Sequence, residues 1–242
     1  MPTELTIIVY GRSASTLVLK MLYETGVFKL WGTPPAGECT PFRNKPQTWN
    51  RETIAKAWRK VYRLGDHVLA KLPTFAFFID EILILEPSVI VLERNILDIV
   101  RSYIQVGWVP KLRYYHALFG VDTKAVKKYE ELGGTLIEGD IYHLMGVVFA
   151  YSHWKTRKAL MNYPGALTIY YQELMSKPSK VFIDLEEFTG LDPIYRTLWH
   201  DLMKVRHKPT GRPIELDYQT PLLSGLPPHR LKGIADAVER FK

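Results

Sequence analysis

The sequence has almost no cysteine. Its 242 residues include one, Cys39, and a single thiol excludes both an intramolecular disulfide and a metal site built from several cysteines. A chain of this kind suits a reducing compartment, and we expect the protein to be cytoplasmic.

Long apolar runs are also missing. No stretch of about 18 or more apolar residues occurs, so no membrane span is predicted. Residues 1–4 carry no basic lead, and the apolar segment after them is only as long as one strand, so we expect no signal peptide. Because no repeat, low-complexity segment or convincing linker interrupts the chain, we predict a single domain over residues 1–242.

The composition is that of an ordinary globular protein. Hydrophobic residues make up 47% of the chain and charged residues 24%, enough to enclose a sizeable core. The net charge of +7 favours an anionic partner. Charge alone does not choose among a nucleotide, a sulfated or phosphorylated ligand, a nucleic acid and a membrane surface.

Strand-like and helix-like segments alternate along the chain. We predict strands at residues 5–10, 67–72, 88–92 and 166–171, and helices at residues 15–25, 51–64, 74–85, 96–105, 142–162 and 179–189. Residues 32–49, rich in Pro, Gly and polar side chains, are expected to form a loop that could wall a substrate site. The alternation predicts an α/β fold with a mostly parallel central sheet flanked by helices.

A hydroxyl-rich turn follows the first predicted strand. Gly11 permits a tight turn, Arg12 supplies a forked positive charge, and Ser13, Ser15 and Thr16 add hydroxyl donors. A turn that leads from a strand into a helix directs backbone N–H groups and the helix dipole at an anion. The plainer alternative is a capped helix after a core strand, which Ser and Thr also favour.

Two other motifs can be tested against this turn. The Walker A motif ends in Gly-Lys followed by Ser or Thr, and its lysine is absent here, which disfavours ordinary ATP or GTP hydrolysis. A nucleophile elbow requires Gly-x-Ser-x-Gly, but its last position is occupied by Ser15.

A second informative stretch covers residues 89–103. A predicted strand delivers Arg94 to its carboxyl end, and the following helix carries Ser102. Ligands of open parallel sheets bind at the carboxyl ends of the strands, so Arg94 and the turn after Tyr10 are candidates for one site. The alternative is a solvated pair of Arg94 with Asp98 near a helix start.

These residues resemble the sulfotransferases that use 3'-phosphoadenosine-5'-phosphosulfate (PAPS). The family's first motif, Pro-Arg/Lys-Ser-Gly-Thr-Thr-Leu/Trp, is similar to residues 11–17, and its Arg-Asn/Asp-Pro-x-Asp-x-x-x-Ser pattern is similar to residues 94–102. Its Tyr-Glu-Asp-Leu and Phe-x-Gly-Leu features resemble residues 171–174 and 188–191. The three features occur in the family's order and cover most of the chain. The resemblance implies the P-loop-NTPase-like sulfotransferase fold.

The resemblance also implies a donor site. The 5'-phosphosulfate would be held by Gly11, Arg12, Ser13, Ala14, Ser15, Thr16 and Leu17; the 3'-phosphate by Arg94 and Ser102; and the adenine would lie near Tyr171. Three departures accompany this assignment: Ala14 replaces a glycine and Ile96 a proline, and the family's C-terminal basic loop survives only in residues 206–212, where Arg206 and Lys208 would form a lid.

The largest difference between this chain and the related sulfotransferases concerns the residue that acts as general base. Many relatives place a histidine in Thr-His-x-Pro, whereas this chain has Ala-Lys-Leu-Pro with Lys71 at that position. A lysine is normally protonated at neutral pH, so we expect Lys71 to stabilise developing negative charge together with Arg12. Glu38 is the first candidate for the base and His67 the second, although each could be an ordinary surface residue.

The implied reaction transfers a sulfuryl group from PAPS, as co-substrate, to a hydroxyl or amine of a small-molecule or glycan acceptor, leaving adenosine 3',5'-bisphosphate. No metal is required, and His143 and His153 are interpreted as packing or surface residues. Residues 108–119 are a candidate acceptor wall. Two alternatives stay open: a nucleoside or nucleotide kinase with a degenerate phosphate loop, and a non-enzymatic basic module that binds nucleic acid. No nucleic-acid partner is expected, because the basic residues are dispersed.

Overall fold

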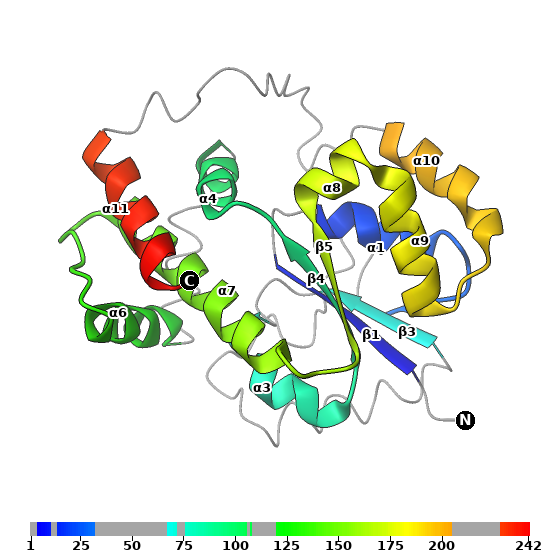
Figure 1. Cartoon of the computed structure of the whole chain (residues 1–242), viewed down its shortest axis with the longest axis horizontal. Helices are drawn as coiled ribbons and strands as arrows, with labels where there is room; N and C mark the ends of the chain where they lie inside the picture. Colours follow the sequence, from blue (N-terminus) through cyan, green and yellow to red (C-terminus); the bar gives the residue numbers. More distant parts are fainter. Residues whose placement is uncertain are drawn as a thin grey trace. The chain divides into compact units, whose positions relative to one another are not determined.

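The computed structural model describes residues 4–10, 14–31, 67–71, 76–105, 107, 120–204 and 228–242. Internal contacts divide the chain into two compact units, Met1–Arg94 with Asn162–Ile214 and Asn95–Met161 with Glu215–Lys242. The first unit contains a β-sheet, and the described part of the second is helical (Figure 1). The expectation of one domain stays a prediction.

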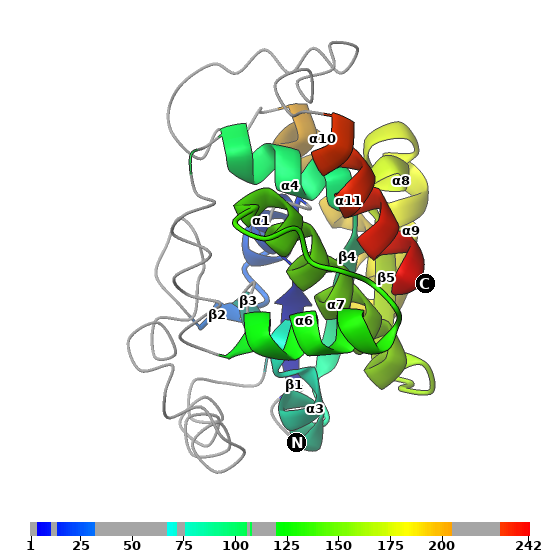
Figure 2. The same ribbon diagram turned by 90° about the vertical axis from the view of Figure 1, so that its left-hand side faces the viewer.

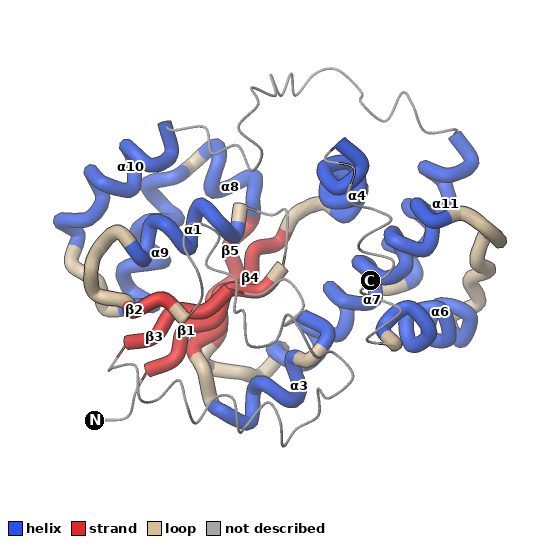
Figure 3. The backbone as a smooth tube through the Cα atoms, turned by 180° about the vertical axis from the view of Figure 1, so that it is seen from behind, coloured by secondary structure: helices blue, strands red, loops and turns tan. Residues whose placement is uncertain are grey.

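The first unit is built on a five-stranded sheet with the order β2-β3-β1-β4-β5 (Figure 3, red). Every pair of neighbours in it is parallel. The strands are β1 (Glu4–Val9), β2 (Lys29–Leu30), β3 (His67–Lys71), β4 (Ser88–Glu93) and β5 (Ala166–Tyr170). The predicted α/β class with a parallel central sheet is therefore confirmed.

Side chains on both faces of the sheet are buried. One face contributes Ile8, Leu69, Ile90, Leu92 and Ile169 to the main hydrophobic core. The intervening residues of the same strands are buried as well, among them Ile7, Val9, Val68, Val89 and Val91, each at most 3% exposed. Burial on both faces explains why these strands are nearly continuous apolar runs in the sequence.

The described helices of the first unit are α1, α3, η4, α8, α9, η5 and α10. Their bounds are Ser15–Tyr23, Ile79–Ile82, Leu83–Leu85, Tyr171–Ser176, Pro178–Thr189, Pro193–Tyr195 and Arg196–Lys204. Helices α1, α8, α9 and α10 lie over the same face of the sheet (Figures 1 and 3). Trp199 of α10 is fully buried; its indole N–H donates to the carbonyl of Met21 at 2.7 Å, and its ring meets Phe182 edge-on. This side chain joins α10 to α1 and α9.

Of the helix predicted at residues 74–85, the structure describes residues 76–85. The α-helix within them is α3, and the tighter turn η4 follows it; Glu86, the residue after η4, has φ of 50°. An apolar segment without a clear polar face gives no periodicity from which its start can be placed. The segments predicted at residues 32–49, 51–64 and 108–119 lie outside the described residues.

The described helices of the second unit are α4 (Ile96–Gln105), α6 (Val121–Glu131), α7 (Ile141–Leu160) and α11 (Pro228–Arg240). The other three pack against α7, as can be followed in Figure 2. Asp140 caps α7 by accepting from the backbone N–H groups of Tyr142 and His143, and it forms an ion pair with Arg230 at 3.0 Å. Asp140 therefore ties the start of α11 to the start of α7.

Tyr129 forms a second link between α6 and α11. Its hydroxyl donates to Asp236 at 2.6 Å, and Asp236 also accepts from Arg240 at 2.9 Å. Burial and the hydrogen bond to Asp236 raise the pKa of Tyr129 to about 12. The phenol is therefore a neutral donor throughout the physiological range.

The two histidines of α7 are packing residues. His143 is 1% exposed and His153 is 3% exposed. The ring of His143 meets Tyr129 edge-on, and its Nδ1 accepts from the N–H of Ile137 at 3.0 Å. No group of three or more possible metal ligands among His, Cys, Asp and Glu gathers in the described part of the chain. Among the described helices, none has the length and apolar character needed to span a membrane.

The burial of His143 makes stability depend on pH. Burial lowers its pKa, and the charges of Asp140 and Asp236 and the Gly233 backbone oppose this shift. An unfolded histidine titrates near its ordinary value of 6.5, so below that pH the unfolded chain binds more protons than the folded one. We expect neutral, buried His143 to make its full contribution to the free energy of unfolding above pH 6.5. The free energy of unfolding should decrease as the pH falls below that value.

Urea unfolding measured at several pH values checks this expectation. His143→Asn keeps an acceptor for the N–H of Ile137 but cannot titrate, so it should flatten the pH dependence just below 6.5. The exposed His229 provides the control, since His229→Asn should leave the slope as in the wild type. An unchanged slope in His143→Asn would contradict the assignment.

Candidate functional site

Four of the predicted site residues, Thr16, Lys71, Arg94 and Tyr171, lie at the carboxyl edge of the sheet. Strands β3, β1, β4 and β5 are neighbours and parallel, so all four end at the same edge. The connection from β1 leads toward the β3 side of the sheet, and the connection from β4 leads to β5 on the other side. Such a reversal of direction is where open parallel sheets bind ligands, and it lies between the ends of β1 and β4.

The turn between β1 and α1 is bounded by two residues with left-handed backbones. Tyr10 has φ of 74° and Ala14 has φ of 69°, although neither is glycine. Ala14 is also the N-cap of α1, and its methyl group forms no capping hydrogen bond. No acidic residue occupies the first turn of α1. The described part of this turn therefore leaves the N-terminal end of α1 favourable to an anion.

Lys71 and Thr16 are brought together by the sheet register. Lys71 is the last residue of β3 and pairs with Ile8 of β1, which points toward α1. Its ammonium donates to the Thr16 hydroxyl at 2.9 Å, and the lysine is 4% exposed. A buried cation requires polar partners, and Thr16 supplies one from the first turn of α1. Two of the predicted residues are thus in direct contact.

Arg94 and Tyr171 form a second contact at this edge. Glu93 pairs with Tyr170 in the ladder between β4 and β5, so the residue after each strand is placed beside the other. The guanidinium carbon of Arg94 lies 4.3 Å from the centre of the Tyr171 ring. The cation thus lies over the face of the phenol ring.

His67 lies at the opposite end of β3 from Lys71. It is the first residue of the strand, pairs with Glu4, and is exposed, with its ring edge-on to Phe28. Four residue steps along a strand span about 13 Å. The structure therefore does not bring His67 to the edge that carries Lys71.

Ser102 lies on α4 in the second unit and is 7% exposed. The start of α4 is capped by Asn95, whose side-chain oxygen accepts from the N–H of Leu97 at 2.9 Å. Ile96 is then the first helical residue, the position at which a proline is readily replaced. The remaining predicted site residues, Gly11, Arg12, Ser13, Glu38, Arg206 and Lys208, lie outside the described residues.

Sequence reasoning did not anticipate the backbone at Tyr10 and Ala14. It named Gly11 as the residue that permits the turn, because glycine is the usual sign of a positive φ. The substitution of Ala14 for the glycine of the related motif was the available signal. The same reasoning assigned Lys71 and Thr16 separately and did not foresee their hydrogen bond.

No protein-family model matches this sequence, and the search of curated proteins finds no match either. Among solved structures, a sulfotransferase domain from the curacin biosynthetic pathway is 18% identical to this chain. The match covers 81% of this chain and 77% of that domain, with a TM-score of 0.48. At this level of similarity an activity has to be argued from the residues of the chain itself.

The left-handed backbone at Ala14 predicts that Ala14→Gly stabilises the protein. A left-handed conformation costs an L-residue about 1–2 kcal/mol, and glycine avoids this cost. Glycine also raises the entropy of the unfolded chain, which offsets part of the gain in stability. We expect a net increase of about 1 kcal/mol in the free energy of unfolding, measured by denaturant titration. Ala235→Gly within α11 serves as the matched control and should decrease stability by about 1 kcal/mol. Equal losses in both variants would contradict the strain at Ala14.

Proposed function

We propose that this protein is a sulfotransferase that moves a sulfuryl group from PAPS to a hydroxyl or amine. One observation supports the proposal: four neighbouring parallel strands end at one edge of the sheet, and this edge carries Thr16 after β1, Lys71 at the end of β3, Arg94 after β4 and Tyr171 after β5. Thr16, Arg94 and Tyr171 belong to the sulfotransferase-like motifs, and Lys71 takes the place of the family's histidine. These residues are joined in pairs, Lys71 with Thr16 and Arg94 with Tyr171. Four separate segments of the sequence thus contribute to one region of the first unit.

The two contacts divide the proposed donor site into two ends. The turn after β1, with Arg12 and the hydroxyls of Ser13, Ser15 and Thr16, would hold the 5'-phosphosulfate at the start of α1. Arg94 would hold the 3'-phosphate, and Tyr171 would lie near the adenine. The role predicted for Ser102, which belongs to the second unit, stays a prediction. Arg206 and Lys208 would close over the donor as a basic lid.

Transfer in this proposal is an in-line displacement. The acceptor oxygen or nitrogen forms a bond to sulfur as the bond from sulfur to the phosphate oxygen breaks, and adenosine 3',5'-bisphosphate leaves with the bonding electrons. Lys71 and Arg12 stabilise the charge that builds on the transferring group and on the leaving oxygen. The acceptor proton passes to a base, for which we retain Glu38; His67 is omitted because of its place at the other end of β3.

The acceptor is proposed only as a class, a small-molecule or glycan alcohol or amine. A kinase-like alternative requires a donor without a 3'-phosphate and lacks the Gly-Lys pair of a phosphate loop. The two functions differ in what the Arg94 end of the site recognises. That difference makes nucleotide binding the deciding measurement.

Calorimetric titration should show that adenosine 3',5'-bisphosphate binds much more tightly than AMP. A charge-assisted hydrogen bond contributes about 1.5–3 kcal/mol, so Arg94→Ala should weaken binding of the bisphosphate at least about tenfold and leave AMP little changed. Lys204→Ala on α10, which removes an exposed cation paired with Asp201, is the control and should keep the preference. Equal affinity of the wild type for both nucleotides would refute the proposal and favour the kinase-like alternative.

Lys71→Met tests the catalytic role of the buried ammonium. Methionine is unbranched and apolar, so it can occupy the site of the lysine stem while removing the charge. We expect turnover to fall by about a hundredfold or more with a smaller change in donor affinity, because the charge acts mainly in the transition state. Loss of donor affinity at unchanged turnover would make Lys71 a binding residue instead.

A further inference from the structure

We propose that the ring of Tyr171 is a support that fixes the Arg94 guanidinium in the orientation needed to bind a phosphate group. This inference rests on the proposed function, because it assigns the phosphate to the 3' position of the donor. It gives Tyr171 a positioning role, separate from contact with the adenine.

Arg94 and the Tyr171 ring are in direct contact. The guanidinium carbon of Arg94 lies 4.3 Å from the centre of the ring, within the range of a cation–π contact. The N–H donors of a guanidinium lie in its plane and point outward from its edge. An arginine held against a ring can therefore present these donors to a phosphate in two parallel hydrogen bonds.

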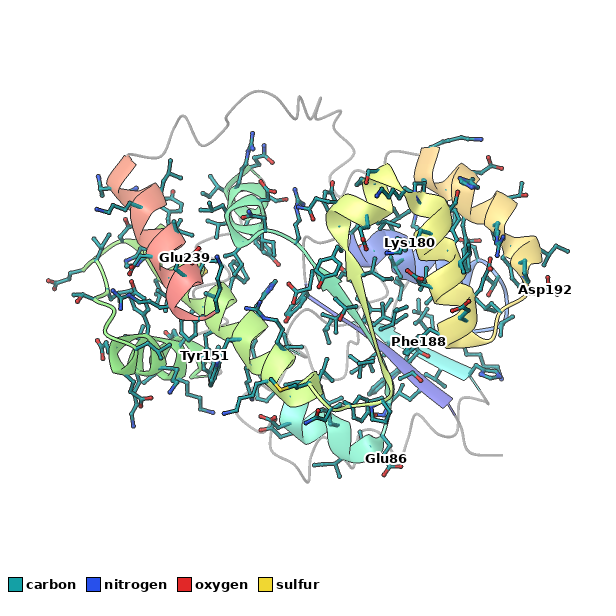
Figure 4. All side chains as sticks on the ribbon, viewed as in Figure 1. Glu86, Tyr151, Lys180, Phe188, Asp192 and Glu239 are labelled. Carbon is teal, nitrogen blue, oxygen red and sulfur yellow. The ribbon has the colours of Figure 1, made fainter. Side chains whose placement is uncertain are left out.

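Tyr171 lies on an element whose backbone is held in place. It is the first residue of α8 and directly follows β5, which is held to β4 along five paired positions. One turn further along α8, Leu174 is fully buried in the main core. Glu173 of α8 is paired at 3.2 Å with Lys180 of α9, labelled in Figure 4. The ring is therefore attached to backbone that is held from both sides.

The side chain of Arg94 has much conformational freedom to lose. Arg94 follows the last residue of β4 and carries a long side chain with many rotamers. An arginine that is ordered only when the phosphate binds loses this freedom at that moment, which weakens binding. The contact with the Tyr171 ring removes part of that loss before the ligand arrives.

A support and an adenine contact make different predictions. An adenine contact affects AMP and adenosine 3',5'-bisphosphate equally, because both contain adenosine. A support for Arg94 affects only the bisphosphate. The ratio of the two affinities therefore reports the position of Arg94, and the AMP affinity reports the adenine contact and the integrity of the fold.

The experiment is a calorimetric double-mutant cycle with both nucleotides. Tyr171→Phe retains the ring and should retain the preference for the bisphosphate within about threefold. Tyr171→Leu removes the ring and should lower the preference about tenfold. The double variant Arg94→Ala/Tyr171→Leu should be no worse than Arg94→Ala alone, because the support has no function without the arginine.

The outcomes separate this inference from the proposed function. Equal affinity of the wild-type protein for the two nucleotides overturns both. A wild-type preference that survives Tyr171→Leu, or losses that add in the double variant, overturns the support alone. If Tyr171→Leu lowers the folded fraction in circular dichroism, Tyr171→Met provides the same test with an unbranched side chain. In either variant, a fall in AMP affinity equal to the fall in bisphosphate affinity makes Tyr171 an adenine contact only.

Discussion

The backbone ladder that pairs β1 with β3 on one side and β4 on the other is the interaction on which the candidate site depends. Parallel pairing forces strands that are far apart in the sequence to end at one edge. Thr16, Lys71, Arg94 and Tyr171 are brought to that edge by main-chain hydrogen bonds and by apolar residues on both faces of the sheet. The contacts among these side chains are a consequence of the strand register, which brings the side chains together.

The candidate site contains a buried charge and strained backbone, and both are supported by the stable sheet. A lysine is buried at the end of β3, and two residues other than glycine adopt left-handed backbones on either side of the turn. Each such backbone costs about 1–3 kcal/mol and persists only where the surrounding structure fixes it. The core beneath, with Trp199 joining three helices, supplies that support. Conformations of this kind concentrate at binding turns, which agrees with the function proposed for this one.

Sequence reasoning located the strands that form the site because their apolar runs are short, clear and ended by turn residues. The four predicted strands correspond to β1, β3, β4 and β5, and the helix at residues 96–105 matches α4. It did not assign β2, α6, α8, α10 or α11. The two residues of β2 form a strand only by pairing with β3, and α10 packs through Trp199 onto α1 and α9, so both depend on partners far away in the sequence. The contacts of Lys71 with Thr16 and of Arg94 with Tyr171 depend on strand register. The strands are apolar on both faces, so they show no alternation of apolar and polar residues from which the register could be inferred. His67 shows the same limit, since a candidate base was named without regard to which end of its strand it occupied.

The hydrogen bond from Lys71 to Thr16 determines where the hydroxyl hydrogen of Thr16 can point. A hydroxyl that accepts from an ammonium has its oxygen lone pair engaged on that side, so its own hydrogen is turned elsewhere. The bond also polarises the O–H, which makes it a stronger donor than a serine or threonine acting alone. The Thr16 hydroxyl therefore extends part of the positive potential of Lys71, a buried residue of β3, to the first turn of α1.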